Sequence, residues 1–211
     1  MQKHYAEENE VLYHVGFAKH ALEGATIAVL PGDPGRVEPL AHTLGHDAHF
    51  IATHREYTSW LTYIYERPVL VCSTGMGGPS VAICLEELAR MGITHVIRVG
   101  TTGTIQKSVS LGDVIIDKAA VRLDGTSQHY APLEFPAVAS FEVTQALGVL
   151  NYEMETSALF VTAQALGIQA GAVCGVVVKR TDSESVAPPE VYMKAFKFMA
   201  QVTRGAIERL K

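Results

Sequence analysis

The stretch His95–Gln106, with the sequence HVIRVGTTGTIQ, sets an arginine inside the apolar run of what the pattern predicts to be a buried strand. Because an unpaired charge is very costly to bury, Arg98 needs an anionic partner. An acidic side chain would satisfy it with no function implied. A dianionic ligand would satisfy it too, helped by the hydroxyls of Thr101 and Thr102 and by the amides that follow Gly100.

Short apolar runs alternate with amphipathic ones on both sides of this stretch. Buried strands are predicted at Thr26–Leu30, Pro68–Ser73, His95–Gly100, Gly112–Asp117 and Ala170–Arg180, and a half-exposed strand at Glu56–Tyr65. Helical spacing predicts helices at residues 37–44, Ser80–Met91, Glu153–Leu166 and Pro189–Leu210. This alternation indicates an α/β fold with a largely buried sheet, in one domain over residues 1–211.

Composition excludes several classes of function. The chain has 211 residues, of which 48% are hydrophobic and 18% charged, enough for an ample core. A net charge of −5 without a basic cluster argues against nucleic-acid binding. The apolar runs are too short for a membrane helix, and we expect no signal peptide. The scattered Cys72, Cys84 and Cys174 are typical of reduced core thiols in a cytoplasmic protein, and they form no C-x-x-C pair.

Two glycine-rich loops follow predicted strands. In Pro31–Arg36 (PGDPGR), the glycines permit close backbone approach to a ligand and Arg36 supplies a cation. In Thr74–Ser80 (TGMGGPS), backbone N–H groups could form an anion nest at a helix N-terminus. Taken singly, the first loop is explained equally well as a plain β-turn with a surface arginine. The second loop is explained equally well as a tight strand-to-helix connection.

The stretch NYEMET, residues 151–156, places Glu153 and Glu155 on either side of Met154. One interpretation is a pair of solvated carboxylates near a helix N-terminus, where the helix dipole favours them. The other is a carboxylate that accepts hydrogen bonds from a diol, with Met154 as an apolar floor. Arg55 could be a further cation, although taken alone it is typical of a surface residue.

Together these motifs resemble the nucleoside phosphorylase family, and its bacterial uridine phosphorylase branch most closely. The resemblance covers almost the whole chain in order. Its motifs are HVGF, VLPGDPGRVE, THREYTSW, VLVCSTGMGGPSVAICLEELARMG, RVGTTGTIQ, LGDVIID, VRLDGTSQHYAPLEFPAVASFE, NYEMET and GVVVKRT. It implies a phosphorylase/hydrolase-like fold with a mixed central β-sheet flanked by helices.

The resemblance also assigns roles to particular residues. The phosphate site it implies comprises Gly32, Arg36, Arg55, Arg98 and Thr101, with Arg55 lent by a neighbouring subunit. The nucleoside site it implies comprises His14, Thr101, Met154, Glu155 and Arg180, with His14 also lent across a dimer. Of these, Arg98, Glu155 and Arg180 are the expected catalytic residues. Glu56, Met76 and Ser80 match positions that hold a monovalent cation such as potassium between subunits, and the loop DSESVAPPEV matches a mobile flap.

The implied activity is reversible phosphorolysis of uridine, with deoxyuridine as a further candidate substrate, to uracil and the pentose 1-phosphate in pyrimidine salvage. The resemblance implies phosphate as co-substrate, no organic cofactor and a cytoplasmic homohexamer built as a trimer of dimers. The alternatives are a purine nucleoside phosphorylase of the same fold, a nucleosidase that uses water, which should lack the arginine cluster, and a non-catalytic paralogue that binds nucleoside or phosphate.

The chain departs from the family between residues 147 and 151. Only Gly-Val-Leu stands where the family has several tens of residues, including a sheet strand and the side chains that read the base. Either the chain has lost this segment or the printed sequence omits it. We favour omission, because loss of a strand would expose core and leave backbone groups unpaired. A true loss would favour the non-catalytic paralogue.

Overall fold

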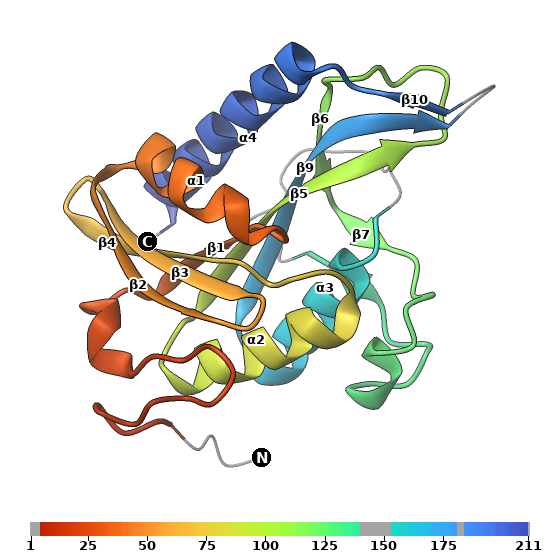
Figure 1. Ribbon diagram of the computed structural model, residues 1–211. Coiled ribbons are helices and arrows are strands. Elements are labelled where there is room, and N and C mark those ends of the chain that lie inside the picture. The colour runs from red at the N-terminus through yellow and green to blue at the C-terminus, as the bar shows by residue number, and fades with distance from the viewer. Residues whose placement is uncertain (1–4, 140–152, 181–183, 211) are drawn as a thin grey trace.

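The computed structural model describes residues 5–139, 153–180 and 184–210 (Figure 1). Its centre is an eight-stranded sheet of order β10-β9-β5-β1-β4-β3-β2, with β6 paired to β9 as well. The strands of this sheet are β1 (Ile27–Leu30), β2 (His46–His54), β3 (Tyr57–Ile64), β4 (Arg67–Cys72), β5 (His95–Thr104), β6 (Val114–Asp117), β9 (Gln169–Arg180) and β10 (Glu184–Val186). A separate small pair joins β7 (Ala119–Ala120) to β8 (Ala137–Val138).

The sheet is mixed, as expected. Strand β1 lies parallel to β4 and β5, and β5 lies parallel to β9. Strands β2, β3 and β4 form an antiparallel meander, and β6 and β10 run antiparallel to β9. The parallel strands β4, β1, β5 and β9 therefore all end at one edge of the sheet, where ligands bind in open α/β sheets.

Helices cover both faces of the sheet (Figure 1). The helices are α1 (Val37–Leu44), α2 (Gly78–Arg90), α3 (Thr156–Leu166) and α4 (Pro189–Arg209). One hydrophobic cluster joins the sheet to α2 and α3, and a second joins it to α1 and α4. All four residues of β1 are buried because both of its faces are covered.

The predicted elements lie within a few residues of the observed ones, and four short or polar strands of the described residues were not predicted. Strand β2 is mostly exposed and His-rich, so it carries no apolar alternation. The pair β7–β8 has two residues in each strand. The segment expected to be a mobile flap contains β10, an exposed strand that pairs with the end of β9. Strand β10 is held by backbone pairing with β9, and such pairing leaves no hydrophobic pattern from which the strand could be predicted.

Strand β5 is longer than predicted. It runs to Thr104, and its residues from Gly100 onward pair with β9. This pairing uses the backbone groups on the β9 side of β5, where the partner strand lies. The availability of other amides after Gly100 for an anion stays a prediction. Arg98 lies within the strand rather than at its end.

All three cysteines are buried, and each is a free thiol. None of the described helices is both long enough and apolar enough to cross a bilayer. The segment predicted to be missing between residues 147 and 151 lies outside the described residues, and the one-domain interpretation stays a prediction.

Gly45 follows α1 where the chain passes against β3. A Cβ atom at this position would lie 2.2 Å from the carbonyl oxygen of Tyr63 and 2.8 Å from Oγ1 of Thr62. We expect Gly45→Ala to lower the free energy of unfolding by about 1–3 kcal/mol or more, because sheet backbone cannot move aside. Chemical denaturation of the purified variant measures this.

Gly205→Ala is the matched control. Gly205 lies inside α4, and an added Cβ there would approach only the flexible end of Arg209, at 3.4 Å. This substitution should be neutral or stabilise the fold by about 0.5–1 kcal/mol. Equal destabilisation by the two changes would contradict the packing described for Gly45.

Candidate anion and ligand site

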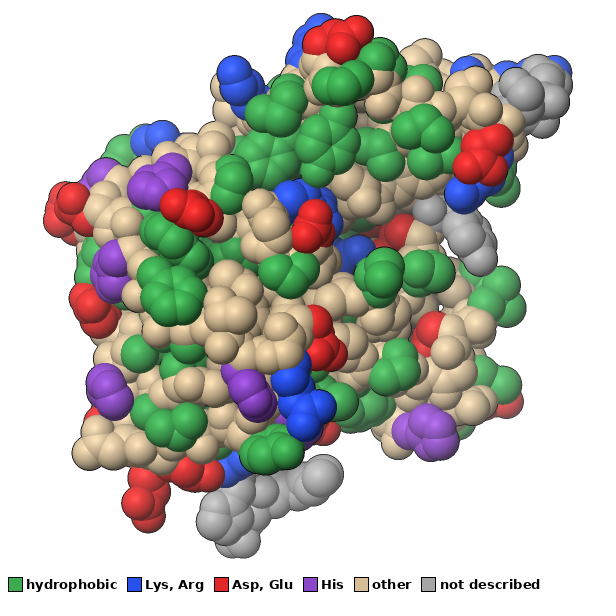
Figure 2. Space-filling model, viewed as in Figure 1, with side chains coloured by type: hydrophobic (Ala, Val, Ile, Leu, Met, Phe, Trp, Pro, Cys, Tyr) green, Lys and Arg blue, Asp and Glu red, His purple; other side chains and the backbone are tan. Residues whose placement is uncertain are grey.

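A cavity of about 760 Å³ opens at the carboxyl edge of the parallel strands. Figure 2 shows a hollow on this face in which acidic and basic side chains lie together. The walls come from the loops after β1 and β4, from the distal half of β5, from the end of β9 and from the start of α3. The fold thus gathers segments far apart in the sequence around one hollow.

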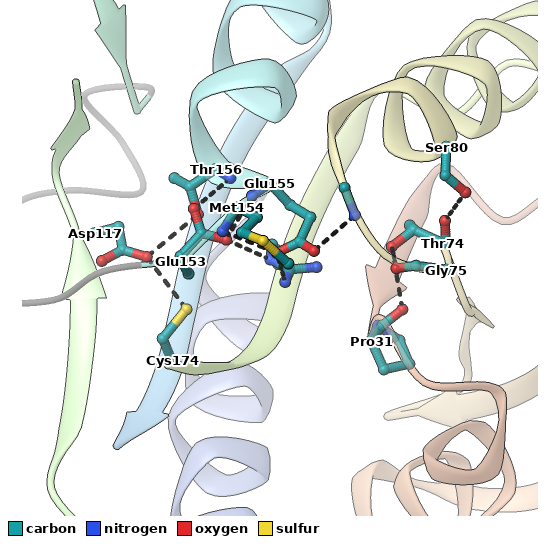
Figure 3. Close-up of polar contacts among 12 residues, drawn as sticks. Pro31, Thr74, Gly75, Ser80, Asp117, Glu153, Met154, Glu155, Thr156 and Cys174 are labelled. Carbon is teal, nitrogen blue, oxygen red and sulfur yellow. Dashed lines mark hydrogen bonds and ion pairs between the residues drawn. The ribbon is translucent and has the colours of Figure 1, made fainter. Parts of the chain in front are cut away.

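Backbone hydrogen bonds hold the loops after β1 and β4 against each other. The amide of Thr74 donates to the carbonyl of Pro31, and that of Gly75 to the carbonyl of Gly32, both at 2.9 Å. Figure 3 shows Pro31 beside Thr74 and Gly75. The Asp33 carboxylate accepts the amide of Gly35 at 2.9 Å and so closes the turn that precedes Arg36. Both predicted glycine loops therefore line one cavity, and neither is an isolated turn.

Two guanidinium groups meet beside Gly32. A Cβ at Gly32 would lie 3.5 Å from Nη2 of Arg36 and 3.8 Å from Nη1 of Arg98. The Nη1 atoms of both arginines are buried and have no hydrogen-bond partner among the described residues. Burial, the largest cause, and the nearby Arg98 charge lower the pKa of Arg36. An anion bound here would satisfy both unpaired donors.

Arg98 also has acidic partners inside the protein. Its Nη2 donates to Glu155, and its Nε donates to Glu153 at 3.2 Å. The Arg98 side chain is 4% exposed, so these pairs lie in the interior. The interpretation that acidic side chains neutralise Arg98 is confirmed, and because one donor stays open, an anionic ligand for Arg98 stays a prediction.

The carboxylates of NYEMET are not the solvated pair that one interpretation described. The side chains of Glu153 and Glu155 are 8% and 7% exposed. Burial alone would raise the pKa of Glu155, but Arg98 and the amides of Gly77 and Met154 hold it below its ordinary value. Burial raises the pKa of Glu153, although the Arg98 charge opposes the shift. The pKa values of the two carboxylates are thus shifted in opposite directions, and Glu155, with the lowered pKa, is ionised at neutral pH.

The remaining residues predicted for the nucleoside site, apart from His14, lie around the same cavity. Thr101, Met154 and Arg180 all line it. Arg180 is 48% exposed, pairs with Glu184 of β10 at 3.4 Å, and has its Nη1 3.2 Å from the Cβ position of Gly103. Arg180 thus lines the cavity with an exposed guanidinium that is paired at its Nε.

Two predicted residues do not reach the cavity of their own chain. Arg55 is exposed, with Nη2 3.2 Å from the hydroxyl of Tyr13 and its guanidinium 5.4 Å from that ring. His14 packs edge-on against the same Tyr13 ring, and its Nδ1 lies 2.7 Å from Glu87. His14 and Arg55 thus lie side by side on one surface, as two residues lent to the same neighbour would.

The predicted cation residues are brought together in part. The hydroxyl of Ser80 donates to the Glu56 carboxylate at 2.9 Å and also contacts the carbonyl oxygen of Thr74 (Figure 3). The Met76 side chain is 83% exposed, and it lines the main cavity together with Glu56. Oxygen atoms of Ser80, Glu56 and Thr74 thus lie together, and the potassium site stays a prediction.

Glu153 is the residue that sequence reasoning did not select. Its carboxylate accepts hydrogen bonds from Arg98, from the Glu155 amide at 3.0 Å and from the Thr156 amide at 2.5 Å. The spacing Glu-x-Glu before a helix was visible in the sequence. The sequence did not show which of the two carboxylates accepts the backbone amide at the start of α3.

The chain matches the family model described as the phosphorylase superfamily over residues 26–147. It is 42% identical to a uridine phosphorylase of Haemophilus influenzae and 40% identical to one of Escherichia coli, with 82% of this chain and 88% of each relative covered. It is also 32% identical to a guanosine phosphorylase of Halorubrum lacusprofundi, with 71% of this chain and 77% of that protein covered.

The alignments also bear on the departure after residue 147. The Haemophilus alignment spans 223 residues, whereas 82% of 211 residues is about 173, so about 50 aligned positions have no counterpart here. The family match ends at Leu147.

Removal of the Arg98 charge should leave two buried carboxylates without their cation. We expect Arg98→Met to lower the free energy of unfolding by roughly 3–5 kcal/mol near neutral pH. The carboxyl pKa values would then rise above those of the unfolded chain, so the penalty should shrink as pH falls toward about 5. Urea denaturation of variant and parent at both pH values measures this.

Arg90→Met is the control for this prediction. Arg90 pairs with Glu10 at 2.7 Å, and both side chains are 40% exposed. An exposed pair contributes at most about 1 kcal/mol, so this change should be small at both pH values. A loss at Arg98 no larger than at Arg90 would contradict the buried ion-pair assignment.

Proposed function

The chain belongs to the phosphorylase superfamily, and from this premise we propose that it is a uridine phosphorylase, a pentosyltransferase that cleaves uridine with inorganic phosphate. The observation that carries the proposal is the convergence of Arg36 and Arg98 at Gly32, each with an unpaired donor, beside the ionised Glu155. A dianion and a polyol would bind side by side in such a site.

Phosphate is the attacking group in the proposed reaction. Its oxygen forms a bond to C1′ of the ribose as the N-glycosidic bond breaks, and uracil leaves with the electron pair and takes up a proton. Arg36 and Arg98 hold the dianion beneath the sugar, and such positioning can supply on the order of 7–11 kcal/mol of the barrier in favourable cases. The phosphate charge stabilises the positive charge that develops on the sugar.

The other residues act on the sugar and the leaving base. Glu155 accepts hydrogen bonds from the ribose 2′- and 3′-hydroxyls, Met154 packs against the ring, and Thr101 contributes its hydroxyl. Arg180 meets the negative charge that develops on uracil, directly or through water. Because phosphate is the nucleophile, no activated serine or cysteine is needed.

A second copy of the chain completes the site in this proposal. It supplies Arg55 to the phosphate and His14 to the ribose 5′-hydroxyl, which accounts for their joint position on a surface away from their own cavity. A potassium ion held by Glu56 and Ser80, near Met76, would lie at the same contact. We propose a hexamer made of three such dimers, acting in pyrimidine salvage.

We place this reaction in the cytoplasm. The support is the set of three buried thiols, which is typical of a reducing compartment. Nucleoside and phosphate are the proposed partners, with no nucleic acid, no membrane and no organic cofactor.

Purine phosphorolysis is the second candidate, on the strength of the similarity to a guanosine phosphorylase. According to the resemblance, the side chains that read the base lie in the family segment that has no counterpart in this sequence after Leu147. The two uridine phosphorylases are more similar to this chain and cover more of it, which favours uridine.

Incubation of the purified protein with uridine should release uracil only when phosphate is present. Chromatography of the products with and without phosphate measures this, with guanosine as the competing substrate. Equal release without phosphate would indicate a hydrolase. Faster cleavage of guanosine would favour the purine candidate.

Arg55→Ala tests the shared site. Arg55 is exposed, so the fold should be unaffected, while loss of a charge-assisted contact should raise the phosphate KM by roughly tenfold or more. Steady-state kinetics at varied phosphate measure the effect, with Arg90→Ala as the surface control. An unchanged phosphate KM would remove Arg55 from the site.

A further inference from the structure

We propose that Glu153 is a positioning residue that holds Arg98 by its Nε and so aims the free Nη1 of Arg98 at the bound phosphate. The inference rests on the proposed function for its catalytic consequence, because it concerns the phosphate half of that site. It assigns to Glu153 a role separate from that of Glu155, which is expected to contact the ribose.

The contacts of Glu153 make it a junction between three parts of the site (Figure 3). Its Oε2 accepts hydrogen bonds from Arg98 Nε at 3.2 Å and from the Glu155 amide at 3.0 Å. Its Oε1 accepts the Thr156 amide at 2.5 Å, at the first residue of α3. One carboxylate therefore fixes the cation, the neighbouring carboxylate and the helix end relative to one another.

A guanidinium group is planar and rigid, so anchoring two of its nitrogens fixes the direction of the third. Glu153 anchors Nε of Arg98 and Glu155 anchors Nη2. The nitrogen that is left, Nη1, has no partner among the described residues and lies 3.8 Å from the Cβ position of Gly32. Without Glu153, Arg98 would have one anchor and could swing about it.

The two carboxylates also differ in the role that each has in the proposed site. Arg36 and Arg98 bring two positive charges, and Glu153 and Glu155 bring two negative ones when both are ionised. In the proposed function Glu155 also contacts the sugar hydroxyls, whereas the hydrogen-bond partners of Glu153 all belong to the protein: Arg98 and the amides of Glu155 and Thr156. An anchor that stays on Arg98 keeps the phosphate donor in place after the sugar has bound.

Glu153→Gln is the direct test, because glutamine keeps the size of the side chain. In glutamine one of the two carboxylate oxygens is replaced by an NH2 group, which donates, so the side chain can no longer accept from Arg98 at one oxygen and from Thr156 at the other. We expect phosphate affinity, measured by calorimetry with inorganic phosphate alone, to fall on the order of tenfold. The phosphate KM should rise by a similar factor, and the uridine KM should change less.

Asp124→Asn is the matched control. Asp124 also serves the start of α3, because its carboxylate accepts the Ser157 hydroxyl at 2.7 Å and the Ser127 amide at 2.7 Å. No contact between Asp124 and Arg98 is recorded among the described residues. A change that acts only by loosening the helix end would therefore appear in both variants. Glu153→Asp, which keeps the charge and two acceptors, should recover part of the phosphate affinity.

Each outcome of the phosphate-binding measurements either supports or overturns the positioning role of Glu153. Weaker phosphate binding in Glu153→Gln, with near-parent binding in Asp124→Asn and partial recovery in Glu153→Asp, supports the positioning role. Parent-like phosphate affinity in Glu153→Gln overturns it, and so does an equal loss in both variants at equal stability. Failure of the parent protein to cleave uridine would count against the proposed function, whereas the calorimetric comparison would still decide the role of Glu153.

Discussion

The buried ion pairs of Arg98 are the interaction on which the site depends. A guanidinium that is 4% exposed can persist in a sheet interior only where anions surround it, and Glu153 and Glu155 provide them. The same pairs tie β5 to the start of α3, so the site and this part of the fold share one set of contacts. The nitrogen left unpaired on Arg98 gives the arrangement its capacity to bind an external anion.

Sheet topology brings the other groups to Arg98. The parallel strands β4, β1, β5 and β9 end at one edge, so the loops that follow them must meet there. Gly32 belongs to this arrangement because a side chain at its position would enter the space between Arg36 and Arg98. Residues about 120 positions apart in the chain, from Gly32 to Glu155, thereby form one cavity.

Much of the fold could be predicted from local pattern. Near-continuous apolar runs indicated β1, β4, β5, β6 and β9, and helical spacing indicated α1, α2, α3 and α4. The elements that escaped, β2, the β7–β8 pair and β10, are exposed or very short, so burial left no periodic signal in them. Most site residues came from a family resemblance, because side-chain types and spacing alone left each loop with an ordinary structural explanation.

By itself the sequence determined the α/β class, the buried character of the strands and the need of Arg98 for an anionic partner, because periodicity and the cost of burying charge are local properties. Only the tertiary structure decided which nitrogen of Arg98 each carboxylate takes, since two carboxylates two residues apart are equivalent until the chain folds. It also decided that β5 continues past Gly100, and that His14 and Arg55 lie away from their own cavity. These are facts of distance between remote segments, which the order of residues does not contain.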